Sequence, residues 1–268
     1  MTKKERGYLT ELYYFALSFF VYGFLGWCTE VAYAAAKQGK FVNRGFLNGP
    51  ICPVYGIGVG VVVQFLTPVE NNLVLLYISS TILVTVIEGI TGFLLEKIFH
   101  NKWWDYSEQP LNIGGYVCVL FSLIWGVFCV LIVKIIHPLI YKVLTMIPLV
   151  LGIVVMACLA VGLLADLYVT ASGILKMNRR LEAMEKIADE LKELSDKVGE
   201  NIYENVMEGM EFREEKKARI EELKAKYEEM AENRTKVGER LVKAFPKMQV
   251  GQHKEIFEEL RERIKRSK

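Results

Sequence analysis

Long apolar stretches separated by short polar ones fill the first two-thirds of the chain. Most of these stretches approach the roughly 20 residues that a helix needs to cross a bilayer core about 30 Å thick. They are Leu12–Ala36, Ile51–Leu66, Leu73–Leu95, Gly115–Ile136 and Pro148–Ala171. The pattern therefore predicts an all-α fold, a polytopic transmembrane helix bundle with about five spans.

Two places in this pattern leave the path of the chain open. The stretch Ile51–Leu66 is short and rich in glycine, so we expect a broken or steeply packed helix there. Its Gly56 and Gly60 have the spacing that brings membrane helices into close contact, within one chain or between subunits. The stretch His137–Met146 contains Pro138, and we interpret it either as an interfacial turn or as a continuation of the helix before it.

The last third of the chain has a different pattern, in which apolar residues recur every three or four positions among charged ones. Three such stripes lie within 181–198, 220–241 and 256–264, and Gly199 permits a break between the first two. This spacing is typical of amphipathic helices. We therefore predict a charged helical extension over 173–268 that forms a helical hairpin or a coiled coil.

The distribution of charge agrees with this division. Residues 171–268 hold 23 of the 33 Lys and Arg and 22 of the 31 Asp and Glu. We accordingly divide the chain into a transmembrane bundle, 1–172, and a charged cytoplasmic helical tail, 173–268. The net charge of +2 is small, and no Lys/Arg stripe with interleaved aromatic residues is present, so the sequence gives no indication of nucleic-acid binding.

Positive charges in the short loops indicate the orientation of the bundle. They occur in the first loop, in the third loop and at the start of the tail, as Lys37, Lys40, Arg44, Lys97, Lys102, Lys176, Arg179 and Arg180. With five spans these three segments share one side, which we predict to be the cytoplasm. Lys3, Lys4 and Arg6 at the N-terminus oppose this assignment but are outnumbered. The sequence thus predicts a multi-pass protein of the cell membrane with a cytoplasmic tail.

Three acidic residues lie inside the predicted spans: Glu30, Glu88 and Asp166. Under the predicted topology each lies roughly 8–12 Å from the cytoplasmic end of its helix. An acid in the membrane costs at least about 2.5 kcal/mol, so each should face the bundle interior and find a partner. We expect the three carboxylates to share one polar pocket, although each acid alone is also explained by snorkelling or helix capping.

Two loops on the same predicted side add further polar residues. Arg44, in the first loop, carries a planar guanidinium that can pair with Glu30 or Asp105, or bind an anion. In the third loop Trp104 and Tyr106 flank Asp105, and their alternative role is that of interfacial anchors. The candidate ligand-binding residues are Glu30, Asn43, Arg44, Glu88, Trp104, Asp105, Tyr106, Asn112 and Asp166.

Several of these residues belong to short motifs that together resemble one family. The motifs are Gly26-Trp27 with Glu30, Gly39-Lys-Phe-Val-Asn-Arg-Gly45, Gly49-Pro50, Trp104-Asp-Tyr-Ser107, Asn112, Gly115 and Trp125-Gly126. In this combination the chain resembles the ABC-transporter type IV family, also called CmpB-like, over about residues 12–172. The resemblance implies a membrane permease component. Tyr116 stands where the resemblance leads us to expect a basic residue, so the sequence does not support a second anion-binding position.

The sequence limits the chemistry that this chain performs alone. No phosphate-binding Gly-x-x-x-x-Gly-Lys-[Ser/Thr] loop is present, so we do not expect the chain itself to be an ATPase, and a homo-oligomer or a separate ATPase subunit are the alternative partners of a permease role. Neither a catalytic triad nor a metal-ligand cluster is visible, and all five cysteines lie in apolar segments. We therefore expect no metal and no cofactor, and an enzymatic role is the less favoured one.

Three functions remain open on these observations. The first is a permease-like protein with a cytoplasm-facing polar pocket, with membrane lipid, a second copy of the chain or an ATPase subunit as partners. The second is an enzyme that acts on lipid headgroups at the same interface. The third is a membrane-anchored interaction protein that works through its tail.

Overall fold

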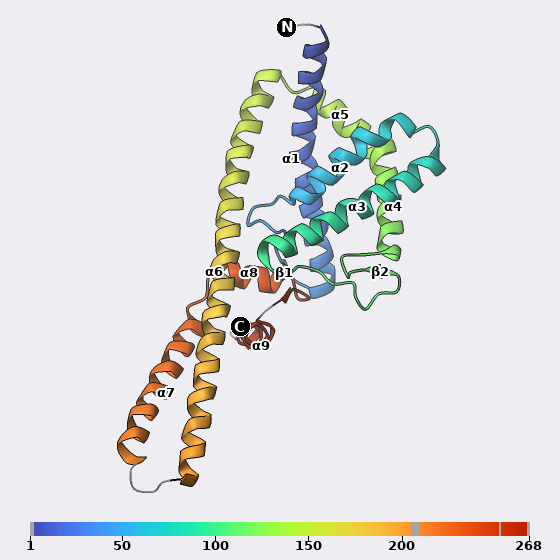
Figure 1. The fold of residues 1–268 in the computed structure, drawn as a ribbon. Helices are drawn as coiled ribbons and strands as arrows, with labels where there is room; N and C mark the ends of the chain where they lie inside the picture. Colours follow the sequence, from blue (N-terminus) through green and yellow to red (C-terminus); the bar gives the residue numbers. More distant parts are fainter. Residues whose placement is uncertain (1–2, 205–208, 252, 267–268) are drawn as a thin grey trace. The chain divides into compact units, whose positions relative to one another are not determined.

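The structure is a computed structural model that describes residues 3–204, 209–251 and 253–266. Nearly all regular structure in these residues is helical, which confirms the predicted fold class (Figure 1). The helices are α1 (Lys3–Gln38), α2 (Pro53–Leu66), α3 (Leu73–Phe99), α4 (Val119–Leu131), α5 (His137–Thr145), α6 (Leu149–Glu204), α7 (Gly209–Glu232), α8 (Lys236–Ala244) and α9 (Lys254–Arg266). A 3-10 turn spans Thr67–Val69, and a π-helical turn, η2, spans Ile132–Ile136. Four two-residue strands complete the regular structure: β1 (Asn101–Lys102), β2 (Asn112–Ile113), β3 (Val117–Cys118) and β4 (Gln249–Val250).

Four helical segments of the described chain are long and apolar enough to cross a membrane: Leu9–Gln38, Leu73–Phe99, Val119–Thr145 and Leu149–Lys197. The remaining predicted span corresponds to a shorter apolar helix, Pro53–Val69. Of this segment, α2 itself has 14 residues and rises about 21 Å, which is less than the thickness of a bilayer core.

The stretch from His137 onward continues the helix before it instead of forming a loop. Helix α4 passes through η2 into α5, and Pro138 lies in the first turn of α5. Proline has no backbone N–H and cannot make the regular bond to the preceding turn, so a wider π turn accommodates it without ending the helix.

Helices α1 and α2 pack closely because glycines on each face bulky side chains on the other. A Cβ atom built on Gly60 would lie 2.8 Å from Cε2 of Phe15, and one built on Gly56 would lie 2.5 Å from the carbonyl oxygen of Phe19. These pairs advance along the two helices in opposite directions, so α1 and α2 are antiparallel. The Gly56/Gly60 pair therefore mediates a contact within the chain.

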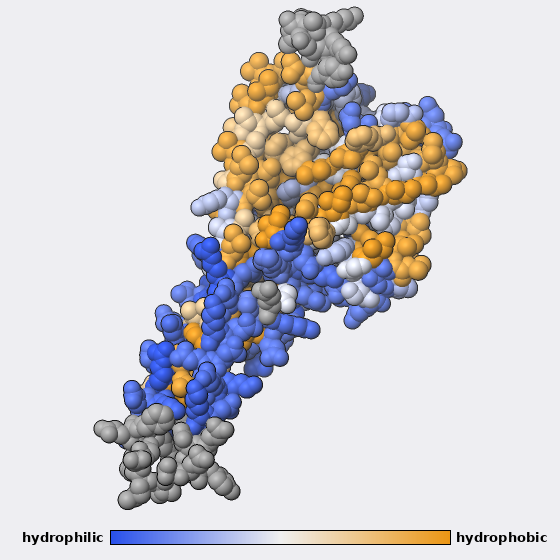
Figure 2. Space-filling model, in the orientation of Figure 1, coloured by the Kyte–Doolittle hydropathy of each residue, from blue (hydrophilic) through white to orange (hydrophobic). Residues whose placement is uncertain are grey.

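The apolar residues of this bundle fall into a small interior and a large outer surface. A buried cluster of Val62, Leu66, Leu76, Cys129 and Val133 joins α2, α3, α4 and η2. Many other large apolar side chains of these helices are exposed, and Figure 2 shows them as a wide hydrophobic surface. Helices that are apolar on all sides are solvated by lipid or protein and not by water.

The contacts of the chain define two compact units. Unit 1 comprises Met1–Thr170 together with Lys243–Gln249, and unit 2 comprises Ala171–Val242 together with Val250–Lys268. Residues 243–249 belong to unit 1, whereas the predicted division between 172 and 173 places them in the tail. That division stays a prediction.

Unit 2 buries residues from all three predicted stripes: Leu181, Met184, Leu223, Leu241, Phe257, Leu260 and Ile264. Arg219 of α7 donates to Glu190 of α6 at 3.0 Å, and Arg263 of α9 donates to Glu228 of α7. Helix α6 continues through Gly199 to Glu204, so no break occurs at that glycine. Coiled-coil packing of these helices stays a prediction.

Candidate functional site

The centre of the candidate site is an ion pair about two turns before the end of α1. Arg44 Nε lies 3.2 Å from Glu30 Oε2, and the two side chains are 29% and 25% exposed. The Tyr55 hydroxyl donates to the other carboxylate oxygen of Glu30 at 2.7 Å. The Arg44 guanidinium also lies over the ring of Tyr33, 4.7 Å from its centroid. The structure thus contains the predicted pair with Glu30, and adds two tyrosines that the sequence did not single out.

Asn43 stabilises the conformation of the loop 39–52, which carries Arg44. Its side-chain oxygen accepts hydrogen bonds from Trp27 Nε1 at 2.8 Å and from the backbone N–H of Gly45 at 3.1 Å. Its amide nitrogen donates to the carbonyl oxygen of Asn48 at 2.7 Å. One side chain therefore joins α1 to two points of the loop, so Asn43 is a positioning residue for Arg44.

Asp166, on α6, holds the other end of the same loop. Its carboxylate accepts from the backbone N–H of Gly49 at 2.6 Å and from the backbone and side-chain nitrogens of Asn48 at 3.1 and 2.8 Å. The hydroxyl of Thr170, which is fully buried, donates to it at 3.2 Å. The loop backbone supplies the partner that an acid in an apolar helix requires.

Glu88, on α3, has a partner in the third loop. The Tyr106 hydroxyl donates to Glu88 Oε1 at 3.3 Å, while Glu88 Oε2 is buried and has no hydrogen-bond partner among the described residues. Burial raises the pKa of the Tyr106 hydroxyl, and the charges of Glu88 and, more weakly, Glu30 raise it further. The Tyr106 hydroxyl therefore lies within electrostatic reach of both Glu88 and Glu30.

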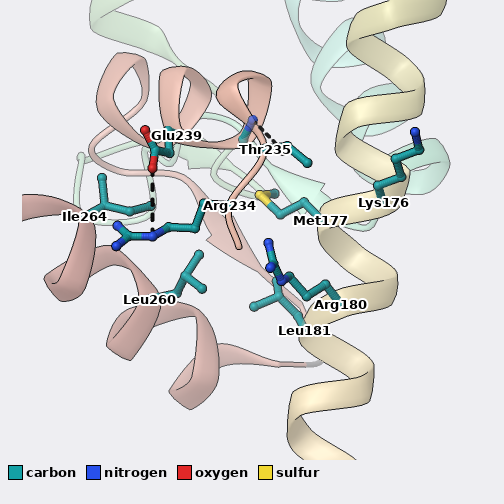
Figure 3. Close-up of a pocket in the computed structure, with 10 residues that line it drawn as sticks. Lys176, Met177, Arg180, Leu181, Arg234, Thr235, Glu239, Leu260 and Ile264 are labelled. Atoms are coloured by element: carbon teal, nitrogen blue, oxygen red, sulfur yellow. Dashed lines mark hydrogen bonds and ion pairs between the residues drawn. The ribbon is translucent and has the colours of Figure 1, made fainter. Parts of the chain in front are cut away.

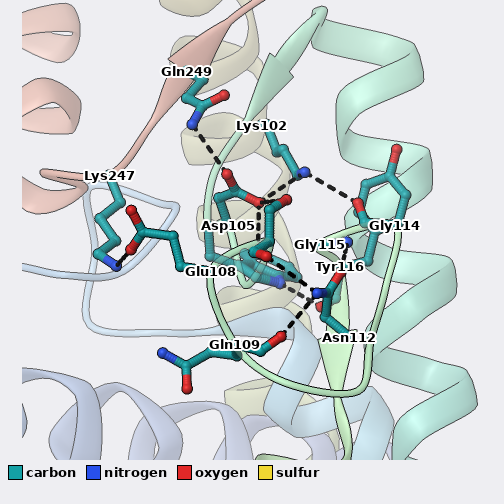
Figure 4. A network of polar contacts seen from close by, with 12 residues as sticks. Lys102, Asp105, Glu108, Gln109, Asn112, Gly114, Gly115, Tyr116, Lys247 and Gln249 are labelled. Atoms are coloured by element: carbon teal, nitrogen blue, oxygen red, sulfur yellow. Dashed lines mark hydrogen bonds and ion pairs between the residues drawn. The ribbon is translucent and has the colours of Figure 1, made fainter.

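The rest of the third loop forms a network around Asp105 (Figure 4). Asp105 Oδ1 accepts from the Ser107 hydroxyl at 2.6 Å and pairs with Lys102 Nζ at 2.9 Å. Partial burial raises the pKa of Asp105, but the bonds from Ser107 and Lys102 outweigh it and lower that pKa to about 2. Lys102 is thus the counter-ion of Asp105, and Arg44 is the counter-ion of Glu30.

Two further candidates, Asn112 and Trp104, stabilise the turn that closes this loop. Asn112 Oδ1 accepts from the backbone N–H of Gly115 at 3.1 Å, and Trp104 Nε1 donates to the carbonyl oxygen of Tyr116 at 2.8 Å. Gly115 has a φ of +72°, and a Cβ atom there would overlap the Asp105 carboxylate and Lys102 Nζ. The turn therefore requires glycine at this position.

A segment near the C-terminus contributes to this loop and was missed by the sequence analysis. Phe245 lies edge-on to Trp103, with ring centroids 5.2 Å apart, and Trp103 is only 3% exposed. Gln249 Nε2 donates to Asp105 Oδ2 at 3.1 Å, and Lys247 lies 3.6 Å from Glu108. The segment lies between two amphipathic stripes and has no periodic pattern of its own, so the sequence carried no signal for these contacts.

The nine candidate residues thus form two neighbouring groups with different partners. One group contains Glu30, Asn43 and Arg44, held in place by Asp166, and the other contains Glu88, Trp104, Asp105, Tyr106 and Asn112. The described contacts give each intramembrane acid its own hydrogen-bond donors. A single ligand pocket shared by all three acids stays a prediction.

Unit 2 contains a separate pocket, shown in Figure 3, that is too small for a ligand. Arg180 and Arg234 are among its lining residues, and Arg234 Nε lies 3.8 Å from Glu239. Its volume of about 20 Å³ is close to that of one water site. We assign no function to it.

The helices and the loops together define the class of protein. Four apolar helical segments of membrane-crossing length, the first of which carries an ion-paired glutamate, are those of a multi-span integral membrane protein. Residues 17–171, more than half of the chain, match the family described as Putative ABC-transporter type IV (CmpB type), and the chain belongs to that family. No curated protein and no solved structure matches the chain.

Proposed function

We propose that this protein is the permease-like membrane component of a transport system, with a polar pocket formed where the loops 39–52 and 100–118 meet the ends of α1 and α3. The observation that carries the proposal is the Glu30–Arg44 pair with its Tyr55 hydrogen bond. Charged groups in membrane helices are costly and in transporters commonly mark the substrate or ion pathway.

The geometry supports a site that a solute can reach and that has a hydrogen-bond acceptor without a partner among the described residues. About a quarter of each side chain in the ion pair is exposed, so a solute can reach both charges. Glu88 adds a buried carboxylate oxygen with no hydrogen-bond partner among the described residues. Such a group can accept a proton or a donor group of a ligand without first breaking an existing bond.

The proposal assigns the partners as well. Since the chain has no phosphate-binding loop, ATP hydrolysis must come from a separate subunit, and one chain of so few spans suits a homo-oligomer surrounded by membrane lipid. The pocket and the tail, residues 173–268, lie on the cytoplasmic side in this proposal.

A permease must open its pocket to both sides of the membrane, whereas an anchor or an interfacial enzyme needs only one. We would change the five cysteines to alanine and introduce Thr29→Cys beside Glu30, at an exposed position. Alkylation by a membrane-impermeant maleimide would be followed in right-side-out and inside-out vesicles. Thr67→Cys, in the loop after α2, is the matched control and should react from the opposite side only.

Under the proposal Thr29→Cys reacts quickly from the side of the tail and more slowly from the other side. Reaction from one side only, under conditions in which the Thr67→Cys control reacts fully from its own side, would refute a permease role. The same data test the predicted orientation, because the control must be labelled from the side opposite the tail.

A further inference from the structure

Unit 1 contains a cavity of about 140 Å³ where α1, α2 and α5 meet. Its lining includes Ser18 and Tyr22 of α1, Gln64 of α2, and His137 and Tyr141 of α5. Ser18 precedes Glu30 on α1 by roughly 18 Å of helix, so this cavity is separate from the candidate site described above. No residue of the two groups around Glu30 and Glu88 lines it.

Specific features of the fold form this cavity. Gly60 leaves room for the Phe15 ring, which becomes part of the wall. The π turn η2 ends directly before His137, and π turns occur frequently at functional sites. His137 Nδ1 lies 2.9 Å from the hydroxyl of Tyr22, a residue that is only 3% exposed. A polar pair thus lines the cavity together with Ser18 and Gln64.

The lining combines aromatic rings with a single acid. Tyr14 and Tyr141 pack with ring centroids 5.2 Å apart, and Tyr141 lies 5.9 Å from the His137 ring. Glu11 also lines the cavity and is exposed, and neither Lys nor Arg is among the lining residues in the part of the chain whose side chains the structure describes. Aromatic rings beside a carboxylate attract cations, and aromatic cages bind quaternary ammonium groups in particular.

The volume sets the size of the ligand. An apolar cavity of about 150 Å³ accommodates a benzene molecule, so about 140 Å³ suits a trimethylammonium or similar alkylammonium group. A hydrated metal ion would leave the aromatic walls without a role, and an anion would meet the Glu11 carboxylate with no Lys or Arg among the described lining residues to pair with it.

We propose that this cavity is a binding site for a small organic cation of the alkylammonium class, with Glu11 at its mouth and the rings of Tyr14, Phe15, Tyr22 and Tyr141 as its walls. The proposal does not depend on the permease function. A cation can bind here whether or not the Glu30–Arg44 site transports a solute, so either proposal can fail while the other stands.

The test uses the full chain in detergent and a matched pair of ligands. Radiolabelled choline is the probe in equilibrium dialysis, and the competitor 3,3-dimethyl-1-butanol has the same shape without the charge. We expect saturable choline binding, at least about tenfold weaker competition by the neutral isostere, and weakening of about fivefold or more in Glu11→Gln and in Tyr141→Leu. Glu70→Gln and Tyr168→Leu, which lie outside the cavity, are the matched controls and should bind as the unmodified chain does.

Three results would overturn the proposal. Equal competition by choline and its isostere would make the cavity a plain apolar site. Absence of saturable binding up to about 10 mM choline, which corresponds to an affinity weaker than about 3 kcal/mol, would remove the site. Unchanged choline affinity in Glu11→Gln would place the cation elsewhere, and because Glu11 is exposed at the cavity mouth, this variant is expected to fold normally.

Discussion

The ion pair between Glu30 and Arg44 makes the most direct prediction about stability. Glu30→Gln keeps the side-chain volume and leaves an oxygen for the Tyr55 hydroxyl, but it removes the charge that offsets Arg44. Arg44→Ala removes the opposite charge and also the stacking on Tyr33. Each single variant leaves one charge unpaired at the end of an apolar helix, so each should destabilise the protein.

The magnitude follows from the distance and the exposure. At 3.2 Å and an effective dielectric constant of about 20, the attraction amounts to roughly 5 kcal/mol before the cost of removing both charges from water. Exposed pairs contribute about 1 kcal/mol or less, and breaking a fully buried pair costs about 3–5 kcal/mol. Arg44 Nε makes no aligned hydrogen bond although it is close to Glu30, and both side chains are one-quarter exposed. We therefore expect about 1–3 kcal/mol for Glu30→Gln and a coupling energy of about 1–2 kcal/mol.

Thermal unfolding of the full chain in one detergent measures this coupling, with the unmodified protein, both single variants and the double variant. The double variant should lose less stability than the sum of the two single losses, because neither charge then remains alone. Lys37→Ala is the control, since Lys37 lies near the same helix end but over the ring of Tyr33 and not beside Glu30. The stability lost in Lys37→Ala should add to the stability lost in Glu30→Gln when both changes are combined. If the losses of Glu30→Gln and Arg44→Ala were also additive, the pairing of Glu30 with Arg44 would be refuted.

Other contacts predict three further outcomes. Asp166→Asn replaces one carboxylate oxygen by an NH2 group that cannot accept, so either the Gly49 N–H or the Asn48 nitrogens lose their acceptor; it should cost about 1–3 kcal/mol in thermal unfolding and speed hydrogen exchange at Gly49 or Asn48. Because the folded pKa of Asp105 is depressed to about 2, its contribution to stability is present above pH 4 and is lost as the pH falls from about 4 towards 2, so the stability difference from Asp105→Asn should shrink over that interval. Phe245→Ala should expose Trp103 and shift its fluorescence to longer wavelength, whereas an unchanged spectrum would show that the ring contact is not maintained in solution.

The membrane-crossing segments could be predicted because lipid imposes a simple requirement on sequence. A helix in a bilayer needs a continuous apolar run, and the stretches around residues 73–95 and 148–171 are such runs. The course of the chain after His137 could not be predicted, since a proline ends some helices and is tolerated in others. The outcome here depends on the π turn η2, which has no signature in the local sequence.

In the candidate site, too, some contacts could be predicted from the sequence and others could not. The Glu30–Arg44 pair was one of the two pairings that the sequence predicted for Arg44, because a charge inside an apolar helix requires a partner. The partner of Asp166 could not, because backbone N–H groups such as that of Gly49 are present in every loop and carry no sequence signal. The role of Phe245 depends on a contact with Trp103, more than a hundred positions away in the chain.

Both proposed sites depend on one interface, that between α1 and α2. Tyr55 packs directly on Gly26, and this close approach lets its hydroxyl reach Glu30. About three turns earlier on α1 and one and a half turns later on α2, Gly60 receives the Phe15 ring that forms a wall of the cation cavity. A glycine faces a large aromatic ring at each point, so a side chain in either place would separate the helices and disturb the nearby site. Glycines on both helices therefore allow the close approach on which each site depends: Gly26 of α1 accommodates Tyr55 of α2, and Gly60 of α2 accommodates Phe15 of α1.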